Sequence, residues 1–431
     1  MNYKETVNYL YNCVPMFQKE GGSAYKEGLS TTKALDKHLH HPHTKYKTIH
    51  IGGTNGKGST SHTLAAILQH AGYKVGLYTS PHLIDFRERI RVNGAPISQQ
   101  YVVDFIANHK EFYEPLSPSF FELTTALAFD YFVNQEIDIA VIEVGLGGRL
   151  DCTNIIQPDL SIITNISNDH NQFLGNTLAA IAGEKAGIIK EKTPIVIGEY
   201  KDETKPVFQD KAKEMNAPIY FAQDKPMLIE EASKTTSTGW LFDTKQYGKL
   251  EAELGGWCQL KNANTLLTAL PILNVLGYNL SEENIRYGFA HVCEMTGLMG
   301  RWQELQKSPR LVCDTGHNVA GISSIVEQLS HQKYNKLHIV MGMVNDKDSK
   351  GVMQLLPTQA TYYFTEAAVK RALPAEEFAK QARSFDLNGD VFFSVKEATL
   401  AALKNSNKDD LIFVGGSSFI VADLLSFWYN R

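Results

Sequence analysis

The stretch Thr48-Ile-His-Ile-Gly-Gly-Thr-Asn-Gly-Lys-Gly-Ser-Thr60 decides the fold of this chain. An alternating apolar run predicts a strand, a loop rich in glycine follows, and residues 62–70 favour a helix. A strand, a glycine-rich loop and a helix in this order form a phosphate cradle, because glycines let backbone amides turn towards an anion at a helix start. The stretch therefore predicts a phosphate site in a parallel α/β sheet.

Two side chains of this loop suit a nucleotide. Lys57 supplies a point charge for terminal phosphates, and the hydroxyl of Ser59 can hold Mg²⁺. The spacing differs from the common GxxxxGK[ST] pattern, since Gly58 separates the lysine from the hydroxyl. A glycine-rich turn without a ligand is the alternative, and the strand before the loop and the helix after it favour the phosphate site.

The length of 431 residues exceeds what one compact core usually holds, so two domains are expected. A formal net charge of −5 gives no attraction to nucleic acid or to an acidic membrane surface. No apolar run approaches the roughly 20 residues of a membrane span, and the first residues lack a signal-peptide core. The 5 cysteines show no CxxC pair, which argues against disulfides or zinc, and a cytoplasmic protein is expected.

Polar residues follow the predicted strands of the N-terminal half. Ser80-Pro-His82 follows a strand at 74–79, Glu143 stands near the end of a buried strand at 137–145, and Asp169-His170 follows the next strand. Ligands of parallel sheets gather at such carboxyl ends. A carboxylate does not belong in a dry core, so Glu143 is a candidate Mg²⁺ ligand, with structural pairing as the alternative. Loop capping is the alternative for Asp169 and His170.

Three further features leave alternatives open. Ser119 and Glu122 form a capping-box pattern, so Glu122 is either a helix cap or a site residue. Lys185 lies in an apolar helical frame and is either a surface residue or, if buried beside a metal, an amine that adds CO₂ to become a carbamate. Histidines in a polar loop suggest either a metal site or a solvated loop; they are His38, His40, His41 and His43.

The pattern of strands and helices divides the chain into two domains. Residues 1–296 are predicted to form a P-loop-containing ATPase domain with a parallel-rich central sheet and a small β subdomain at 200–255. Residues 297–431 are predicted to form a Rossmann-like α/β domain, although no GxGxxG signature is present. Its strands are predicted at 310–313, 337–341, 361–364, 391–394 and 411–414.

Two motifs together carry a resemblance to a known family. Gly53-Thr-Asn-Gly-Lys-Gly-Ser59 and Ile142-Glu-Val-Gly-Leu-Gly-Gly-Arg-Leu-Asp-Cys-Thr-Asn154 resemble the folylpolyglutamate synthase/dihydrofolate synthase family, within the ATP-dependent Mur-type amide ligases. Further matching stretches span most of the chain: 79–82, 87–90, 119–122, 164–170, 183–187, 300–302, 314–318 and 341–348. The resemblance implies a Mur-ligase-type ATP-binding domain followed by a glutamate-ligase domain.

The resemblance also implies a reaction. ATP phosphorylates a substrate carboxylate to an acyl phosphate, and the amine of L-glutamate displaces the phosphate. The acid is dihydropteroate, giving dihydrofolate, or a reduced folate, giving folylpolyglutamates, or both. Such a transfer needs positioning and charge neutralisation more than a protein nucleophile. The resemblance implies that the protein uses ATP and two Mg²⁺ ions, and a cytoplasmic monomer is expected.

The resemblance assigns roles residue by residue. The catalytic group is Lys57, Lys185 as a carbamylated lysine (N6-carboxylysine), and His317. Implied ATP contacts are Thr54, Asn55, Gly56, Lys57, Gly58, Ser59, Asn264, Arg301 and Asp314. Implied folate or pteroate contacts are Gly28, Phe121, Glu122, Asp151, Cys152, Thr153 and Ser417. Implied metal ligands are Ser59, Ser80, Glu143 and His170.

The sequence departs from the family pattern at three places. Cys152 replaces the usual alanine, and Asp314-Thr-Gly-His-Asn318 replaces Asp-x-Ala-His-Asn. Both are changes among small residues, and the roles are expected to hold. Near the N-terminus Lys26-Glu-Gly28 replaces Asp-Leu-Gly, so an acid is lost there. The balance between dihydropteroate and tetrahydrofolate as substrates therefore stays open.

Other enzyme classes fit less well. A cell-wall Mur ligase carries a nucleotide-sugar domain before the phosphate loop, and only about fifty residues precede it here. A P-loop GTPase needs Asn-Lys-x-Asp, whereas the chain has Asn345-Asp-Lys-Asp348 in its second half. A small-molecule kinase leaves the second α/β domain unexplained. A monofunctional folylpolyglutamate synthase and another Mur-type acid–amino-acid ligase remain open alternatives.

Overall fold

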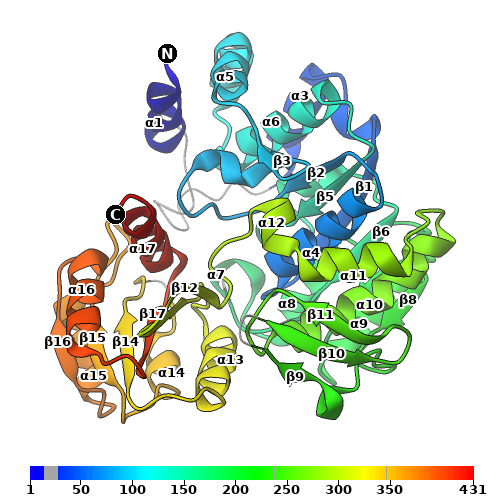
Figure 1. Ribbon diagram of the computed structural model, residues 1–431. Coiled ribbons are helices and arrows are strands. Elements are labelled where there is room, and N and C mark those ends of the chain that lie inside the picture. Colours follow the sequence, from blue (N-terminus) through cyan, green and yellow to red (C-terminus); the bar gives the residue numbers. More distant parts are fainter. Residues whose placement is uncertain (14–27, 170, 237–238, 346) are drawn as a thin grey trace. The chain divides into compact units, whose positions relative to one another are not determined.

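The computed structural model describes residues 1–13, 28–169, 171–236, 239–345 and 347–431 (Figure 1). The chain forms two compact units. The first comprises Met1–His82, Phe86–Glu253 and Gln259–Leu298. The second comprises Leu83–Asp85, Leu254–Cys258 and Met299–Arg431. Two short pieces of the first 258 residues thus belong to the C-terminal unit.

The first unit is built on an eight-stranded sheet with the order β4-β3-β2-β5-β1-β6-β7-β8. The strands are β1(Lys47–Gly52), β2(Val75–Tyr78), β3(Ile90–Val92), β4(Ala95–Pro96), β5(Ile139–Glu143), β6(Leu160–Ile163), β7(Ile195–Ile197) and β8(Ile219–Phe221). β2 and β5 to β8 continue the parallel direction of β1, and β3 and β4 form an antiparallel edge. Because β1 lies between β5 and β6, the polar residues predicted to follow these strands lie together at the carboxyl ends of the parallel strands.

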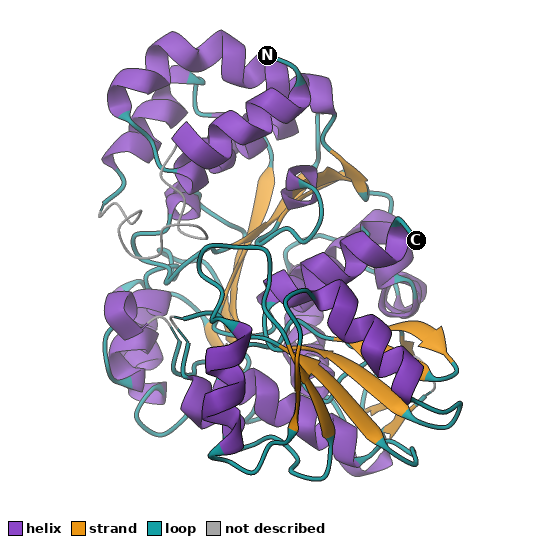
Figure 2. Ribbon diagram, turned by 90° about the vertical axis from the view of Figure 1, so that its left-hand side faces the viewer, coloured by secondary structure: helices purple, strands orange, loops and turns teal. Residues whose placement is uncertain are grey.

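Helices cover both faces of this sheet (Figure 2). They are α1(Tyr3–Cys13), α3(Ser30–His38), α4(Lys57–His70), α5(Gln99–Tyr113), α6(Phe120–Asn134), α7(Asn171–Leu174), α8(Leu178–Ala186), α9(Lys205–Glu214), α10(Gln259–Val275), α11(Glu282–Ala290) and α12(Val292–Thr296). One hydrophobic cluster joins α5 and α6 to β5 through Ile106, Phe129 and Ile142. Another joins α8 and α9 to the β6 side through Ile181 and Phe208. These strands are fully buried, as parallel sheets require.

The segment predicted as a β insertion at 200–255 is only partly one. It first contributes α9 and β8, and β8 extends the central sheet. The small antiparallel sheet consists of β9(Lys234–Thr235), β10(Trp240–Thr244) and β11(Gly248–Ala252). β8 has only 3 residues with incomplete burial, so it lacks the apolar run that marks an inner strand.

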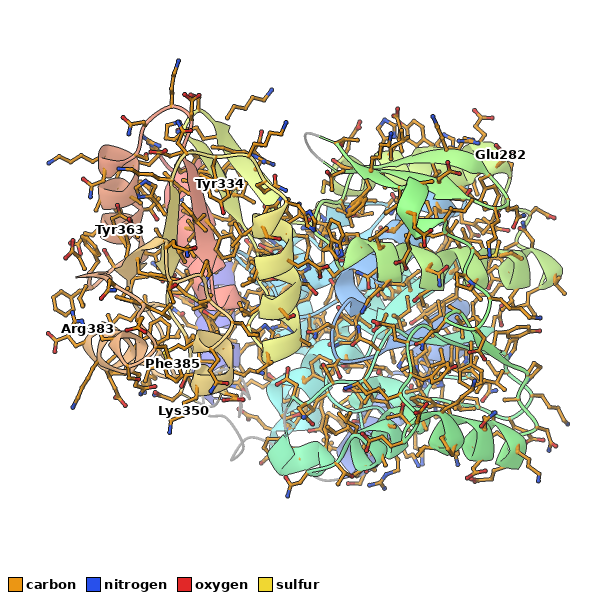
Figure 3. All side chains as sticks on the ribbon, turned by 90° about the horizontal axis from the view of Figure 1, so that it is seen from below. Glu282, Tyr334, Lys350, Tyr363, Arg383 and Phe385 are labelled. Carbon is orange, nitrogen blue, oxygen red and sulfur yellow. The ribbon has the colours of Figure 1, made fainter. Side chains whose placement is uncertain are left out.

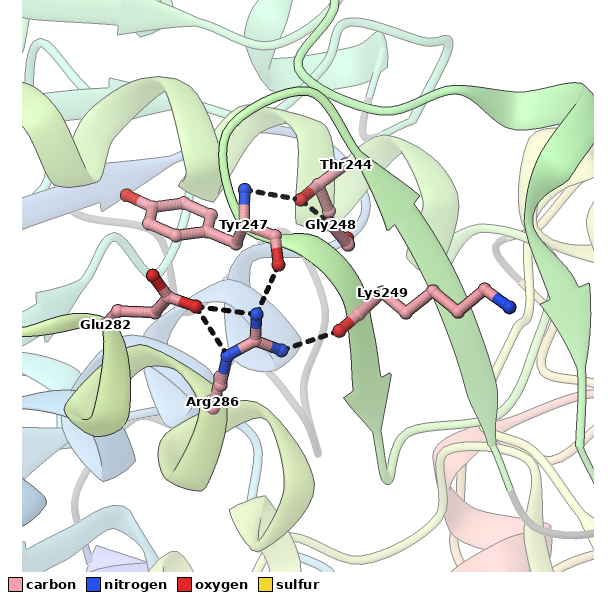
Figure 4. Close-up of polar contacts among 6 residues, drawn as sticks. All are labelled: Thr244, Tyr247, Gly248, Lys249, Glu282 and Arg286. Atoms are coloured by element: carbon pink, nitrogen blue, oxygen red, sulfur yellow. Dashed lines mark hydrogen bonds and ion pairs between the residues drawn. The ribbon is translucent and has the colours of Figure 1, made fainter.

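Arg286 of α11 fixes the β10–β11 turn (Figure 4). Its guanidinium donates to the carbonyl oxygens of Tyr247 and Lys249, and to Glu282 Oε1 one turn earlier, at 2.8 Å from Nε. Within the turn, Thr244 Oγ1 donates to the Gly248 carbonyl and accepts from the Tyr247 amide. One planar group therefore docks the hairpin on the helix that packs along α4.

The second unit is built on a six-stranded sheet with the order β12-β13-β17-β14-β15-β16. The strands are β12(Gln303–Lys307), β13(Arg310–Cys313), β14(Leu337–Met341), β15(Thr361–Phe364), β16(Gly389–Val391) and β17(Leu411–Gly415). Only β12 runs antiparallel to its neighbour. β12 was not predicted, and the strand expected at 391–394 lies at β16 instead. The parallel α/β prediction for this half is confirmed.

Two hydrophobic clusters cover the two faces of this second sheet. The helices are α13(Val319–Ser330), α14(Ser349–Met353), α15(Ala375–Arg383), α16(Val395–Asn405) and α17(Ser418–Tyr429). Exposed side chains such as Lys350 and Arg383 point outward from them (Figure 3). Trp257 belongs to this unit and stacks on His331, with ring centroids 4.4 Å apart. None of the helices in the described part of the chain has the length and apolar character of a membrane span.

The histidine-rich segment is held by a carboxylate. His41 Nδ1 and His43 Nδ1 lie 2.6 and 2.7 Å from the two oxygens of the buried Asp36. His38 stacks on Phe112. In the described ranges no group of three or more His, Cys, Asp and Glu side chains could hold a metal ion. The segment is thus neither the metal cluster nor the plainly solvated loop considered from sequence.

Candidate functional site

The glycine-rich loop lies between β1 and α4, as its sequence predicts. Gly56 caps α4 with φ 86°, and Lys57 is the first helical residue. The loop is tied to the end of β6, since the Thr54 and Asn55 amides donate to the carbonyl and the side-chain oxygen of Asn165 at 2.9 and 3.0 Å. Thr164 Oγ1 donates to the Asn55 carbonyl at 2.6 Å. The cradle therefore has a fixed shape, as an anion site requires.

Lys57 and Lys185 converge on this loop. Lys57 Nζ donates to the carbonyls of Gly53 and Thr54, each at 3.0 Å. Lys185 of α8 is 4% exposed, and its Nζ donates to the Gly53 carbonyl at 2.9 Å. Burial and then the charge of Lys57 lower the pKa of Lys185 to about 7. The alternative of a surface lysine is therefore wrong, and a large share of this amine is uncharged near neutral pH.

Two of the predicted metal ligands lie together at the sheet edge. Glu143 ends β5 and is 3% exposed, and the Ser80 amide donates to its Oε2 at 3.0 Å. Ser59 is buried in the first turn of α4. The carboxylate and the two hydroxyls offer only oxygen donors, which suits a Mg²⁺ ion that keeps some of its waters. His170, the fourth predicted ligand, lies outside the described residues.

Two residues near the phosphate loop were not found from the sequence. Gln259 Nε2 donates to Ser59 Oγ at 3.2 Å, and Gln259 Oε1 accepts from Asn262 Nδ2 at 2.9 Å. The Asn262 side chain also lies so close to Gly56 that no Cβ would fit there. Both residues lie in the first turn of α10, which begins at Gln259, and their Gln-x-x-Asn spacing is the signal that could have revealed them.

Asn264, the predicted ATP contact, has another environment. Its Oδ1 accepts from the Met227 amide at 2.7 Å, and its Nδ2 donates to the Ala222 carbonyl at 3.0 Å. Two helical positions differ by about 200°, so Asn264 and Asn262 lie on opposite sides of α10. The structure therefore brings Asn262, and not Asn264, to the phosphate loop.

The loop after β5 is closed by Asp151. Its Oδ1 accepts from the amide and the hydroxyl of Thr153, at 3.0 and 2.5 Å, and its Oδ2 accepts from the Leu146 amide at 2.8 Å. Burial raises the pKa of Asp151, opposed by these hydrogen bonds. The carboxylate predicted to contact pteroate thus has its acceptor positions occupied by its own loop.

The other predicted folate contacts of the first unit are Phe121, Glu122, Cys152 and Gly28. Phe121 stacks on Tyr78 at 5.8 Å between ring centroids and packs against Gly145. Glu122 completes the capping box with Ser119 at 2.7 Å, which confirms its capping role. Cys152 is a free thiol, and Gly28 has a left-handed φ of 98° at the start of a described range.

The predicted residues of the second unit fall into two groups. Arg301 donates to Thr315 Oγ1, and His317 Nδ1 lies 3.0 Å from the Thr315 carbonyl. Asp314 accepts from the Trp302 and Gly316 amides, each at 2.8 Å, and burial raises its pKa. Asp314 and His317 lie on the loop after β13, and Arg301 lies just before β12, the antiparallel neighbour of β13. Ser417 is buried and caps α17 by accepting from the Ile420 amide at 3.2 Å.

Comparison with known proteins identifies the family. Residues 51–270 match the description "Mur ligase middle domain", and residues 300–418 match "Mur ligase, glutamate ligase domain". The chain is 33% identical over 417 residues to a Bacillus subtilis protein named dihydrofolate synthase/folylpolyglutamate synthase, covering 93% of this chain and 94% of the relative.

Two solved structures share the fold. Escherichia coli FolC in complex with DHPP and ADP has a TM-score of 0.85 and 30% identity, covering 100% of this chain and 98% of that one. A bifunctional folylpolyglutamate synthase/dihydrofolate synthase with Mn, AMPPNP and L-glutamate bound has a TM-score of 0.82 and 29% identity, with the same coverage. The chain therefore belongs to the dihydrofolate synthase/folylpolyglutamate synthase family of Mur ligases.

Proposed function

We propose that this protein is an ATP-dependent ligase that joins L-glutamate to dihydropteroate, to reduced folates, or to both. The observation that carries the proposal is the convergence of Lys57 and the buried Lys185 on the carbonyl of Gly53, inside a phosphate cradle. A second lysine buried at such a loop is costly unless an anion uses it. Relatives of this chain carry both synthase names, and one is described with ADP bound.

Lys57 and the loop amides would hold the β- and γ-phosphates of ATP. The α4 N-terminus adds its partial positive charge. The γ-phosphoryl group passes to the substrate carboxylate, giving an acyl phosphate and ADP. The glutamate amine then attacks the acyl carbon, the amide bond forms, and phosphate leaves as the amine loses its proton. The protein supplies position and charge for both steps.

Ser59, Ser80 and Glu143 would hold Mg²⁺ through oxygen atoms, with His170 as the further proposed ligand. Bound Mg²⁺ would neutralise charge on the phosphate oxygens. Gln259 would orient the Ser59 hydroxyl through its 3.2 Å hydrogen bond. Asn262, which lies against Gly56, takes over the nucleotide contact that the sequence assigned to Asn264.

Lys185 is proposed to carry a carbamate. Its neutral amine would add CO₂ and lose one proton, which converts a buried cation into an anion. Support comes from its burial and from its pKa of about 7, because only the uncharged amine reacts with CO₂. The anion would also relieve the repulsion between Lys185 and Lys57.

The remaining assignments keep the predicted division of labour. Residues 1–296 are proposed to bind ATP and the pteroate or folate, through Phe121, Cys152 and the loop that Asp151 closes. Residues 297–431 are proposed as the glutamate-ligase domain, in which Arg301 and Asp314 contact ATP and His317 acts on the phosphate or glutamate. A cytoplasmic monomer is proposed, consistent with free thiols at Cys152, Cys258, Cys293 and Cys313.

Phosphate release from ATP tests the function. Purified protein is given L-glutamate, Mg²⁺ and either dihydropteroate or tetrahydrofolate. Release that depends on dihydropteroate supports dihydrofolate synthesis, and release with the folate supports polyglutamate synthesis. Release with the folate alone assigns a monofunctional folylpolyglutamate synthase. No release with any pteroate or folate would overturn the proposal and leave another Mur-type acid as substrate.

A further inference from the structure

His50 is a buried polar residue in the middle of β1, two residues before the phosphate loop. Its side chain is 0% exposed. Its strand partners are Ile142 on β5 and Ser161 on β6, so it lies at the centre of the central sheet. Burial, and then the charge of Lys190, lower its pKa to about 3, so the ring is neutral. A leucine would fill such a position at lower cost, so the polar ring calls for an explanation.

The ring begins a chain of hydrogen bonds. His50 Nε2 lies 2.8 Å from Thr153 Oγ1, and that hydroxyl donates its proton to Asp151 Oδ1. Thr153 Oγ1 has one proton, so it must accept from His50, and the ring is the Nε2–H tautomer. The other nitrogen, His50 Nδ1, is buried and has no hydrogen-bond partner among the residues that the structure describes. The series of hydrogen bonds therefore runs in one direction, from His50 on β1 through Thr153 to Asp151.

This series of hydrogen bonds sets the shape of the loop after β5. Asp151 uses its second oxygen on the Leu146 amide, five residues back. Thr153 is fully buried, and its own amide returns to Asp151 at 3.0 Å. The loop backbone packs on the ring of Phe121 at Gly145. A shift of the Thr153 hydroxyl would thus move Asp151, and with it the loop surface beside Phe121.

We propose that His50 is a positioning residue for the pteroate or folate substrate, acting through Thr153 and Asp151 on the loop from Gly145 to Thr153. This proposal rests on the proposed function, because it takes that loop as the wall of the acid-substrate site. The strand that leads into the phosphate cradle then also fixes the wall that holds the carboxylic acid. The same rigid element orients donor and acceptor of the phosphoryl group.

The variants separate positioning from simple filling of the core. His50→Leu fills the space and removes the donor. His50→Gln keeps an N–H at a similar reach. Thr153→Val removes the hydroxyl that links the two. Ser161→Ala is the matched control, because Ser161 is an equally buried strand partner of His50 whose hydroxyl donates to the Ile188 carbonyl, at 3.0 Å.

Steady-state kinetics with the acid substrate varied at saturating ATP, and the converse, tests the proposal. We expect His50→Leu and Thr153→Val each to raise KM for the pteroate or folate about 10-fold, about 1.4 kcal/mol, with KM for ATP unchanged. The double variant should have the same KM for the pteroate or folate as either single variant, since both substitutions break the same series of hydrogen bonds. His50→Gln should recover most of the loss, and Ser161→Ala should match the wild type.

Three results would overturn the proposal. These are an unchanged KM for the acid in His50→Leu, equal losses for the acid and ATP, or a fully additive double variant. If His50→Leu does not fold, the comparison of Thr153→Val with His50→Gln decides alone, and a normal KM in Thr153→Val is then fatal. Failure of the proposed function is distinct, because the wild type itself would then turn over no pteroate or folate.

Discussion

Lys57 and Lys185 donate to the same acceptor, the carbonyl oxygen of Gly53, at 3.0 and 2.9 Å. Burial, and then repulsion by the charge of Lys57, lower the pKa of Lys185. An anion beside these two groups, such as the phosphates of a nucleotide or the proposed carbamate on Lys185, would offset this repulsion.

Lys185→Ala should lower turnover by roughly 100-fold or more, because it removes a charged group beside the transferred phosphate. Short-chain carboxylic acids should restore part of the activity by occupying the vacated space. In the wild type, lowering the pH below about 7 protonates the amine and removes the nucleophile for CO₂, so the carbamate should be lost on the acid side. Mass spectrometry with ¹³C-bicarbonate and activity with and without CO₂ measure this. Full activity in Lys185→Ala would refute the carbamate.

Glu143→Gln keeps the shape of the side chain and removes its charge. We expect activity to fall roughly 100-fold or more and the Mg²⁺ concentration for half-maximal activity to rise, since a carboxylate ligand is lost. A Mg²⁺ titration of phosphate release and calorimetric binding of ATP with and without Mg²⁺ check this. Glu184→Gln is the control, because that carboxylate pairs with Arg149. An unchanged Mg²⁺ dependence in Glu143→Gln contradicts the assignment.

Asn262 and Asn264 should respond in different ways to alanine. Asn262→Ala should weaken ATP binding about 10-fold, since it loses a group at the phosphate loop. Asn264→Ala should leave ATP binding unchanged and lower the melting temperature, because the amides of Met227 and Leu228 lose their acceptor. Nucleotide titration and thermal melts distinguish the two. The reverse pattern would restore Asn264 as the nucleotide contact.

Arg286→Leu should destabilise the hairpin of the first unit. The substitution leaves the Tyr247 and Lys249 carbonyls without their donor, at a cost of about 1 kcal/mol because water can reach the partly exposed group. Thermal melts and proteolysis at the β10–β11 turn measure the change. Lys211→Leu is the control, since Lys211 pairs with Glu214 at an exposed site. Equal melting temperatures for wild type and Arg286→Leu would show that the turn holds without the guanidinium.

The second unit should lose stability in acid through His338. The ring is 3% exposed, with Nδ1 3.1 Å from the Tyr363 hydroxyl, and burial lowers its pKa. The unfolded chain binds a proton below about pH 6.5 that the folded state resists, so stability falls as the pH drops below that value. His338→Phe should flatten this dependence between pH 6.5 and 5. Melts across this range test it, and parallel curves for both proteins would count against His338.

Much of the fold can be predicted from the sequence because local signals, such as capping residues and apolar runs, agree with the elements that form. The capping residues of α5 and α6, Ser98 and Ser119, mark their starts, and the apolar runs mark the inner strands. Prediction fails where the local signal is weak. β8 and β16 are short edge strands of incomplete burial, and only the neighbouring strand fixes their position.

The structure brings some of the predicted site residues together and separates others. Lys57 was singled out by its glycine-rich loop and Glu143 by its place near the end of a buried strand, whereas the burial of Lys185 is visible only in the fold. The face of a helix that meets a loop is not visible, so Asn264 was chosen although Asn262 lies at Gly56. His50 was included only as part of an alternating run that predicts a strand. The fold alone shows that its ring contacts Thr153, 103 residues later.

The chain passes between its two compact units five times, because Leu83–Asp85 and Leu254–Cys258 belong to the unit that otherwise starts at Met299. A fragment that begins after Leu298 would therefore lack part of the second compact unit. The fragment would lack Trp257, the stacking partner of His331, and Leu83, which packs on the core of the second sheet. The C-terminal half alone therefore cannot be exchanged between relatives as a complete unit. A chimaera with a relative would have to inherit these two short segments together with it.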